Sequence, residues 1–337
     1  MSPQIAIVIL NWNGMEIMRK FLPSVITYSQ EADVFVADNH STDNSIAMLR
    51  EEFPSVKIIE FSENYGFAEG YNKALAKIDH PYTLLLNSDV RVTPNWLAPL
   101  LQYMNEHPEV AACQPKIKDE KNHGKFEYAG ASGGFLDYLG YPFCRGRIME
   151  NVEEDMGQYD TILPVFWITG AAMMIRTAIY KQLGGLDGRF FAHMEEIDLC
   201  WRMRSRSMKL VCIPQSTIYH VGGATLPKNN PRKTFLNFRN NLLMIYKNAS
   251  SQQLRKILFW RRILDYVAII HILITGNRKD AYAIYQARKE FHKLLPEFTD
   301  VRKENLSKTT NKDIPEMLQS SILWKYYVQR KRTYSSL

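Results

Sequence analysis

The first third of the chain alternates short apolar runs with segments of helical periodicity. The runs lack a period of two, which favours strands buried on both faces of a sheet. Strands that alternate with helices indicate parallel βαβ units, whose ligands bind at the carboxyl ends of the strands. Ser41 is the predicted N-cap of the second helix. We expect an α/β fold, with strands at 4–10, 33–38, 56–61, 82–87 and 110–115 and helices at about 15–28, 42–53, 67–78 and 95–106.

The rest of the chain has a different pattern. Residues 116–160 carry glycines, charges and few periodic runs, so we expect a long, lid-like excursion there, because irregular segments of this length are usually functional or mobile. Apolar runs resume at 163–176 and 183–206, and from about residue 234 the pattern is helical to the C-terminus. The expected organisation is a domain over 1–233 and a helical region over 234–337.

Composition narrows the class of protein only slightly. The 337 residues are 46% hydrophobic and 23% charged, which is ordinary for a globular protein. The net charge of +7 suits an anionic partner such as a phosphorylated substrate, a phospholipid or a nucleic acid. Only this charge points to nucleic acid, since the sequence has no zinc-finger, RNP-like or basic-helix pattern. We therefore expect no nucleic-acid partner.

The cysteines and the apolar segments bear on the compartment. No two cysteines have C-x-x-C spacing, which argues against a zinc ribbon or a disulfide framework and fits a reducing compartment. The N-terminus lacks the basic start of a signal peptide, and no apolar run reaches the roughly 18 residues of a membrane span. Residues 263–276 come closest, but they contain Asp265 and His271. A soluble or peripheral cytoplasmic protein is expected.

Polar residues gather where the first four predicted strands end. Helix capping and turns explain any one of these groups. Because the carboxyl ends of parallel strands lie along one rim of a sheet, the four groups together favour a nucleotide-sized ligand. The groups are Asn11, the segment 38–43, the segment 63–72, and the triplet of Asn87, Ser88 and Asp89.

Asp89 follows a buried apolar run, where a lone carboxylate is costly unless it is paired, hydrogen-bonded or bound to a metal. A divalent cation that holds a diphosphate needs one or two such oxygens. The alternative is an aspartate that caps the turn before Pro94. His220 is a second candidate ligand, although a lone histidine is more often structural. Gly222 and Gly223 behind it would let the backbone approach a phosphate closely.

A second acidic group lies in the segment FFAHMEEIDLCWRMRSR at 190–206. Glu195, Asp198 and Arg202 are spaced to share one helix face, whereas Glu196 points elsewhere. A solvated acidic helix start that arginines balance is the ordinary interpretation. The aromatic and aliphatic neighbours favour desolvated carboxylates instead, and a raised pKa suits a carboxylate to general base catalysis.

The motifs IVILNWNG, VADNHSTDNS, NYGFAEGYNKAL, LLLNSDV, WITGAAMMIR, FFAHMEEIDLCWR and IYHVGG, in this order, resemble glycosyltransferase family 2. Within it they look most like the rhamnosyltransferase-type enzymes of bacterial surface polysaccharides, over roughly residues 4–248. The resemblance implies a GT-A fold, which is Rossmann-like with a mostly parallel central sheet. It also implies inverting transfer of a sugar from a nucleotide diphosphate to an acceptor hydroxyl, with a nucleotide-sugar half over about 1–115 and an acceptor half over about 116–233.

The same resemblance assigns roles to matching positions. Asp89 and His220 match ligands of Mn²⁺ or Mg²⁺, and Glu196 matches the catalytic base, with Glu195 beside it. Trp167, Gly170 and Asp198 match the acceptor side. The donor-binding positions are Asn11, Asp38, Asn39, Ser41, Asp43, Asn64, Gly66, Asn72, Asn87 and Ser88.

Two positions depart from the family pattern. The metal triplet begins with Asn87 instead of a second aspartate, so metal affinity should depend more on His220. The base position often carries Asp, whereas this chain has Glu, which leaves the choice between Glu195 and Glu196 open. By resemblance, dTDP-linked rhamnose is the leading donor, with UDP-linked galactose, glucose, N-acetylated sugars or galactofuranose as alternatives. The expected acceptor is a glycan or a polyprenyl-diphosphate-linked sugar.

The C-terminal third contains a basic amphipathic pattern at 254–276, with Arg255, Lys256, Arg261 and Arg262 among large apolar side chains. Such a helix can lie on the anionic inner face of the cell membrane, and the family resemblance favours this location. Packing on the catalytic domain or on a partner subunit, as in a homodimer, is the alternative. A similar mixture of basic and aromatic residues recurs at 324–332.

Two other classes of protein are weaker fits. A nucleotidylyltransferase would need a glycine-rich phosphate loop near the N-terminus, and LNWNGMEIMRK is not one. A non-catalytic sugar-nucleotide-binding scaffold is expected to have lost active-site residues, but Asp89, Glu196 and His220 are all present. We therefore expect a metal-dependent, inverting hexosyltransferase.

Overall fold

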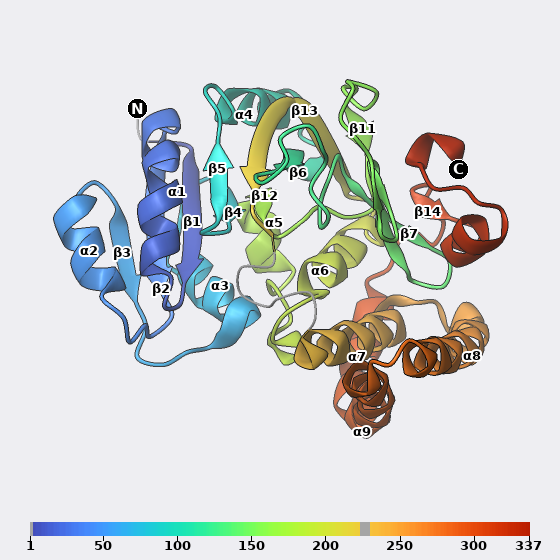
Figure 1. Ribbon diagram of the computed structural model, residues 1–337. Coiled ribbons are helices and arrows are strands. Elements are labelled where there is room, and N and C mark those ends of the chain that lie inside the picture. Colours follow the sequence, from blue (N-terminus) through green and yellow to red (C-terminus); the bar gives the residue numbers. More distant parts are fainter. Residues whose placement is uncertain (1–2, 223–229) are drawn as a thin grey trace.

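A mixed nine-stranded sheet forms the centre of the computed structural model, which describes residues 3–222 and 230–337 (Figure 1). Its order is β11-β13-β6-β12-β4-β1-β2-β3, and β5 pairs with β13. The strands are β1 Ile5–Asn11, β2 Ala32–Asp38, β3 Lys57–Glu60, β4 Tyr82–Leu86, β5 Val90–Val92, β6 Val110–Asp119, β11 Leu163–Pro164, β12 Ala172–Arg176 and β13 Lys209–His220.

Helices cover both faces of this sheet. In β1, Ile5, Ile7 and Ile9 pack toward α1, α2 and α4, whereas Ala6 and Val8 pack toward the side of α3, α5 and α6. The absence of a period of two in the sequence thus reflects burial on both faces. The helices are α1 Met15–Tyr28, α2 Ser45–Glu52, α3 Gly66–Ala76, α4 Leu97–Glu106, α5 Thr177–Gln182 and α6 Glu195–Arg204.

The predicted strands and helices of the first third are confirmed, and β12 lies antiparallel between the fourth and fifth of these strands, β4 and β6. One detail was wrong. Ser41 does not cap α2, which begins at Ser45. The Ser41 hydroxyl instead accepts from the backbone N–H of Asn13 at 2.9 Å, because the loop after β2 folds toward the end of β1.

Residues 116–160 do not form the irregular lid that the sequence predicts. Much of the segment folds into a small, buried second sheet of order β10-β9-β8-β7-β14. Its strands are too short to show a period, and its buried arginines are satisfied by the backbone: Arg145 Nε donates to the carbonyl of Ser132 at 3.0 Å. The strands are β7 Gly134–Asp137, β8 Pro142–Cys144, β9 Arg147–Ile148, β10 Asn151–Val152 and β14 Met317–Leu318.

Three long helices follow, α7 Pro231–Asn248, α8 Ser251–Ile274 and α9 Arg278–Ser307, and lie together beside the α6 side of the sheet (Figure 1). The prediction of helix to the C-terminus was wrong beyond Ser307. The chain returns to the small sheet, where β14 pairs with β7 and the N–H of Ile322 donates to Asp137 Oδ2 at 2.9 Å. Within the described ranges, no helix is long and apolar enough to cross a membrane.

Candidate active site

One rim of the central sheet collects the polar residues that the sequence singles out. β1, β2 and β4 end there, at Asn11, Asp38 and Leu86. β13 is parallel to β6 and brings His220 to the same rim. Because β12 runs in the opposite direction, its start, next to Gly170, also reaches this rim. Segments that are distant in the sequence are therefore gathered at one site.

The ends of β1 and β2 form a hydrogen-bonded group. The Asn11 amide donates to Asp38 Oδ1 at 2.8 Å and to the hydroxyl of Ser41 at 3.1 Å, and the N–H of Ser41 donates to Asp38 Oδ2 at 2.9 Å. Asp43 accepts from the N–H of Met15 at 3.1 Å. Among the described residues, the buried Asn11 Oδ1 has no donor. A buried acceptor without a donor is costly, so this atom suits an N–H or O–H group of a ligand.

A second group shapes the start of α3. The Asn39 amide donates to Asn64 Oδ1 at 2.9 Å and to the carbonyl of Gly66 at 3.0 Å. Gly66 adopts φ of 74°, which a side chain rarely tolerates. Asn72 lies farther along α3, and its amide donates to the carbonyl of Leu186 at 2.8 Å while Oδ1 accepts from Tyr180. Asn72 therefore fastens α3 to the segment before α6, and we assign it a structural role.

An acidic corner surrounds His220. His220 Nε2 lies 3.1 Å from Asp89 Oδ1 and 3.3 Å from the amide nitrogen of Asn87, and Nδ1 lies 3.5 Å from Glu127 Oε1. Burial disfavours the charged form of His220, but Asp89 and Glu127 outweigh burial and raise its pKa to about 10. Burial likewise opposes ionisation of Asp89, yet the hydrogen bond and charge of His220 hold the pKa of Asp89 below its usual value.

This corner fits a divalent cation that takes further ligands from a diphosphate. Within the described part of the chain, no group of three or more His, Cys, Asp or Glu side chains could hold a metal alone. The 3.1 Å between Asp89 Oδ1 and His220 Nε2 is close to the roughly 3 Å that separates neighbouring ligands of an octahedral ion at about 2.1 Å. Binding would require His220 to release its proton. Gly223 lies outside the described residues.

The segment before α6 has a strained backbone. Phe191, His193 and Met194 have φ of 65°, 71° and 74°, in the left-handed region that non-glycine residues rarely adopt. The buried amide of Asn240, on α7, lies 2.8 to 2.9 Å from three backbone carbonyls of this segment. The N–H of Phe67, on α3, donates to the carbonyl of Phe191 at 3.3 Å. These contacts bring the start of α6 to the rim.

Glu195 and Glu196 begin α6 in this setting. Burial, and then the charge of Glu196, raises the pKa of Glu195 well above its usual value, and burial also raises the pKa of Glu196. A helix N-terminus favours a carboxylate by only about 0.3–1 kcal/mol, so burial decides the direction. Glu195 is 3% exposed, whereas Glu196 is partly exposed, and its Cβ lies 3.9 Å from the position a Cβ at Gly170 would take. Glu196 is therefore better placed to reach a substrate.

Two residues predicted to lie on the acceptor side are buried, and their polar groups bond to other parts of the chain. Asp198 is fully buried, and its carboxylate accepts from Arg202 at 2.9 Å, Lys247 at 2.8 Å and Asn248 at 2.8 Å. A contact between Asp198 and an acceptor is therefore not supported, because side chains of α6 and α7 already donate to both of its carboxylate oxygens. Trp167 is 3% exposed, and its indole N–H donates to the backbone of the second sheet. Gly170 alone of this group lies beside Glu196.

Two residues that shape the site are missing from the predicted set. Glu127 lies in the segment GKFEYAG, which has no periodic pattern and no recognisable motif. Asn240 is different, because the pair Asn240 and Asn241 interrupts the apolar face of an otherwise regular helix. A polar pair at such positions indicates buried hydrogen bonds and could have been recognised.

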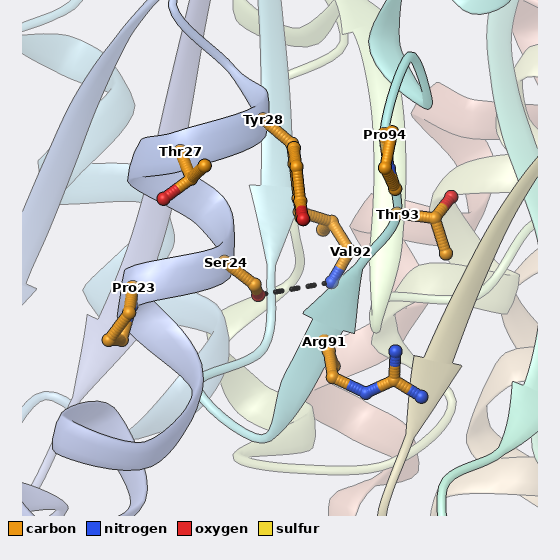
Figure 2. A pocket seen from close by; sticks show the side chains of 8 residues that line it. All are labelled: Pro23, Ser24, Thr27, Tyr28, Arg91, Val92, Thr93 and Pro94. Carbon is orange, nitrogen blue, oxygen red and sulfur yellow. Dashed lines mark hydrogen bonds between the residues drawn. The ribbon is translucent and has the colours of Figure 1, made fainter.

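A cavity of about 370 Å³ lies away from these residues, between α1 and β5 (Figure 2). The N–H of Val92 donates to the hydroxyl of Ser24 there at 3.3 Å and ties the strand to the helix. None of the predicted site residues lines this cavity, so it is not part of the candidate site. Its lining is Pro23, Ser24, Thr27, Tyr28, Arg91, Val92, Thr93 and Pro94.

The sheet order and the rim, with polar strand ends on one side and buried or partly buried carboxylates on the other, are those of a GT-A fold. The chain belongs to the family described as Glycosyl transferase family 2, whose sequence profile matches residues 6–184. It is thus a family 2 glycosyltransferase, of the rhamnosyltransferase-like kind that its relatives represent.

Two curated relatives are rhamnosyltransferases. The N-acetylglucosaminyl-diphospho-decaprenol L-rhamnosyltransferase of Mycobacterium tuberculosis is 23% identical over 239 residues, which are 65% of this chain and 76% of that protein. The rhamnosyltransferase WbbL of Escherichia coli is 21% identical over 221 residues, 64% of this chain and 82% of that protein.

Solved structures confirm the GT-A fold. GalNAc-T7 with UDP, GalNAc and Mn²⁺ superposes with a TM-score of 0.62 at 14% identity, over 97% of this chain and 56% of that chain. S. aureus TarS with UDP-GlcNAc superposes with a TM-score of 0.55 at 14% identity, over 90% of this chain and 89% of that chain. At this identity the likeness concerns the fold alone.

Proposed function

We propose that the chain transfers a hexose from a nucleotide diphosphate to a lipid-linked or glycan acceptor, with inversion and with Mn²⁺ or Mg²⁺. The observation that carries this proposal is the meeting of Asp89, His220 and Glu196 at one rim. Rhamnose linked to dTDP is the first donor candidate, and UDP-linked hexoses are the alternatives. The M. tuberculosis relative is named for a decaprenol-diphosphate-linked acceptor, which supports a lipid-linked acceptor here.

The donor would bind along the nucleotide half of the rim. The orphaned Asn11 Oδ1 and the bonded group of Asp38 and Ser41 offer polar contacts for the nucleoside. Asn39 and Asn64 set the turn at Gly66 beneath it. Asp89 and His220 would hold the cation, which when bound neutralises the charge of the departing diphosphate.

The reaction itself needs one base and one displacement. Glu196 takes the proton of the acceptor hydroxyl, and that oxygen attacks the anomeric carbon from the face opposite the leaving group. The bond from the anomeric carbon to the nucleoside diphosphate breaks as the new glycosidic bond forms. A single displacement inverts the anomeric centre. The charge of Glu196 raises the pKa of the buried Glu195 beside it, because adjacent carboxylates repel, so the two do not ionise together.

A screen of nucleotide sugars tests this function. We expect one donor, with dTDP-rhamnose tested first, to raise the melting temperature with Mn²⁺, and to release nucleoside diphosphate when an acceptor is added. Release of pyrophosphate from a nucleoside triphosphate and a sugar phosphate would show a nucleotidylyltransferase instead. Donor binding without turnover on any lipid-linked or glycan acceptor would favour the non-catalytic scaffold.

We further propose that α8 contacts the inner face of the cell membrane. Its outward face exposes large apolar side chains, among them Ile274 at 80%, Phe259 at 59% and Ile270 at 57%. A face that gathers this many exposed large apolar side chains is typical of a contact with a membrane or a protein partner. A cavity of about 480 Å³ opens on this face, lined by Phe259, Arg262, Ile263, Tyr266, Val267 and Ile270.

The charges on α8 favour an anionic bilayer over a second copy of the chain. The exposed charged side chains of the helix are the cations Arg255, Lys256 and Arg262. Arg261 was wrongly predicted to belong to this basic group, since it is 2% exposed and donates to the carbonyl of Leu139. The acid of the helix, Asp265, is fully buried and bonded to Arg288. A symmetric partner would bring like charges together, whereas anionic headgroups would pair with them.

Flotation with lipid vesicles tests this contact. We expect the protein to bind phosphatidylcholine vesicles that contain phosphatidylglycerol, less so as salt rises, and Ile270→Glu to weaken binding about tenfold or more. Met156→Glu is the matched control, because Met156 is 81% exposed but lies in the second-sheet region. Equal binding by both variants contradicts the proposal, as does a solution dimer that only Ile270→Glu dissociates.

A further inference from the structure

Glu127 is a buried carboxylate that the proposed reaction does not use. It lies between β6 and β7 and is 4% exposed. Its Oε2 accepts from the N–H of Ala129 at 2.6 Å, which fixes the carboxylate on its own loop. Its Oε1 points to His220 Nδ1, 3.5 Å away. A Cβ at Gly222 would lie 2.9 Å from this Oε1, so the chain after His220 closes around the carboxylate.

The two ring nitrogens of His220 therefore face two different carboxylates. Nε2 faces Asp89 at 3.1 Å and is the nitrogen available to a cation at that corner. Nδ1 is buried and, among the described residues, makes no hydrogen bond, and Glu127 Oε1 lies 3.5 Å from it. When a ring binds metal through one nitrogen, a carboxylate at the other nitrogen fixes its tautomer and its orientation. The geometry at His220 has this form.

We propose that Glu127 is a positioning residue that holds His220 in the tautomer and orientation needed to bind the divalent cation. The inference rests on the proposed function, since it takes Asp89 and His220 as the cation's protein ligands. The Nδ1 proton of His220 is held toward Glu127 Oε1, which leaves the Nε2 lone pair directed at the corner shared with Asp89. Glu127 itself does not touch the cation.

This role matters here because the corner offers the cation few protein ligands. Asn87 replaces the second carboxylate that the family pattern often has, so the cation would have few protein ligands to compensate for a misdirected imidazole. Losing an orienting partner of a metal-binding histidine typically weakens metal affinity about 10–100-fold. A purely structural Glu127, which only fixes its loop through Ala129, would leave metal affinity unchanged.

Mn²⁺ binding to Glu127→Gln tests the proposal. The amide is isosteric and its oxygen can still accept from Ala129, but it carries no charge toward His220. We expect Mn²⁺ affinity, followed through the electron paramagnetic resonance signal of free Mn²⁺ with dTDP or UDP present, to fall about 10–100-fold. In turnover, the Mn²⁺ concentration for half-maximal rate should rise by a similar factor, while saturating Mn²⁺ restores most of kcat. Glu153→Gln is the matched control, since Glu153 is bonded to Tyr159 and Tyr334 and not to His220.

The outcomes separate this inference from the function on which it rests. If the unmodified protein and Glu153→Gln bind no Mn²⁺ with either nucleotide, the proposed metal-dependent function fails. If both bind Mn²⁺ and Glu127→Gln binds it equally well, only the role of Glu127 is overturned. If Glu127→Gln melts at a much lower temperature without metal, Glu127→Asp is measured instead. That variant keeps the carboxylate charge but shortens the side chain by one methylene, which moves the charge away from His220. Unchanged Mn²⁺ affinity in that variant also overturns the proposal.

Discussion

Replacing Glu196 with glutamine should lower the rate of sugar transfer by roughly 10²–10⁴-fold, the usual contribution of a general base. The amide keeps the shape of the side chain beside Gly170 but cannot take a proton from the acceptor hydroxyl. Donor binding should persist, because the contacts proposed for the donor are at Asn11, Asp38 and Asp89. Steady-state kinetics together with donor-induced thermal shift measure the two effects separately.

Glu195→Gln is the matched control, with the same chemical change one residue earlier. It should keep most of the activity, since Glu195 is 3% exposed and Glu196 is the carboxylate beside Gly170. A larger loss in Glu195→Gln than in Glu196→Gln would exchange the two assignments. Equal activity of Glu196→Gln and the unmodified enzyme would remove Glu196 as the base.

The pH profile gives a second measure of the same pair. Because burial raises the pKa of Glu196, the rate should fall as pH drops through a value above the usual glutamate range. Stability should show the opposite dependence. A carboxyl whose pKa is raised in the folded state binds its proton more tightly there than in the unfolded chain, so its contribution to stability is lost as pH rises. Glu195→Gln should therefore stabilise the protein increasingly with rising pH.

The rim of the sheet could be predicted because each strand is an unbroken apolar run that stops at a polar residue. Asn11, Asp38 and Asn87 mark those stops in the sequence, and parallel topology places them together. The family resemblance added the GT-A fold, which the central sheet and the solved structures confirm. The insertion of β12 was not predictable from the same pattern, because an apolar run does not show which strand it will pair with.

Side-chain partners that come from distant parts of the chain explain the rest. Asp198 has the same acidic, apolar context as Glu196, yet Lys247, 49 residues later, neutralises it in the folded protein. Glu127 is 93 residues before His220 and carries no signal, since a lone glutamate in an irregular segment is usually solvated. Short strands such as β9 and β10 are below the length at which a period can be seen. Local pattern thus specifies elements, and long-range charge pairing decides which acids are free to react.

Asp89→Asn should abolish the stabilisation of the protein by Mn²⁺ with a nucleotide-diphosphate donor. The amide has no charge for the cation, and of the two proposed protein ligands only His220 would remain unchanged. A bound cation stabilises transition-state charge by several kcal/mol, so transfer should fall by at least about 10²-fold. A donor concentration of about 100 times the Kd stabilises the native fold by about 2.7 kcal/mol. This is measurable as a shift of several degrees in Tm.

The substitution also disturbs the metal-free protein, and the experiment has to separate the two effects. Removing one member of a buried ion pair costs roughly 3–5 kcal/mol when the other stays charged, but His220 still faces Glu127, so a smaller loss is expected. The informative quantity is the difference in Tm with and without Mn²⁺ and donor, because the loss of the ion pair cancels in it. Asp119→Asn is the control, since Asp119 ends β6 and its Oδ1 accepts from the N–H of Lys121 and that of Asn122 in a turn. If Asp89→Asn keeps a metal-dependent shift as large as that of Asp119→Asn, the cation is not held at Asp89, and the charge of Asp89 serves only to pair with His220.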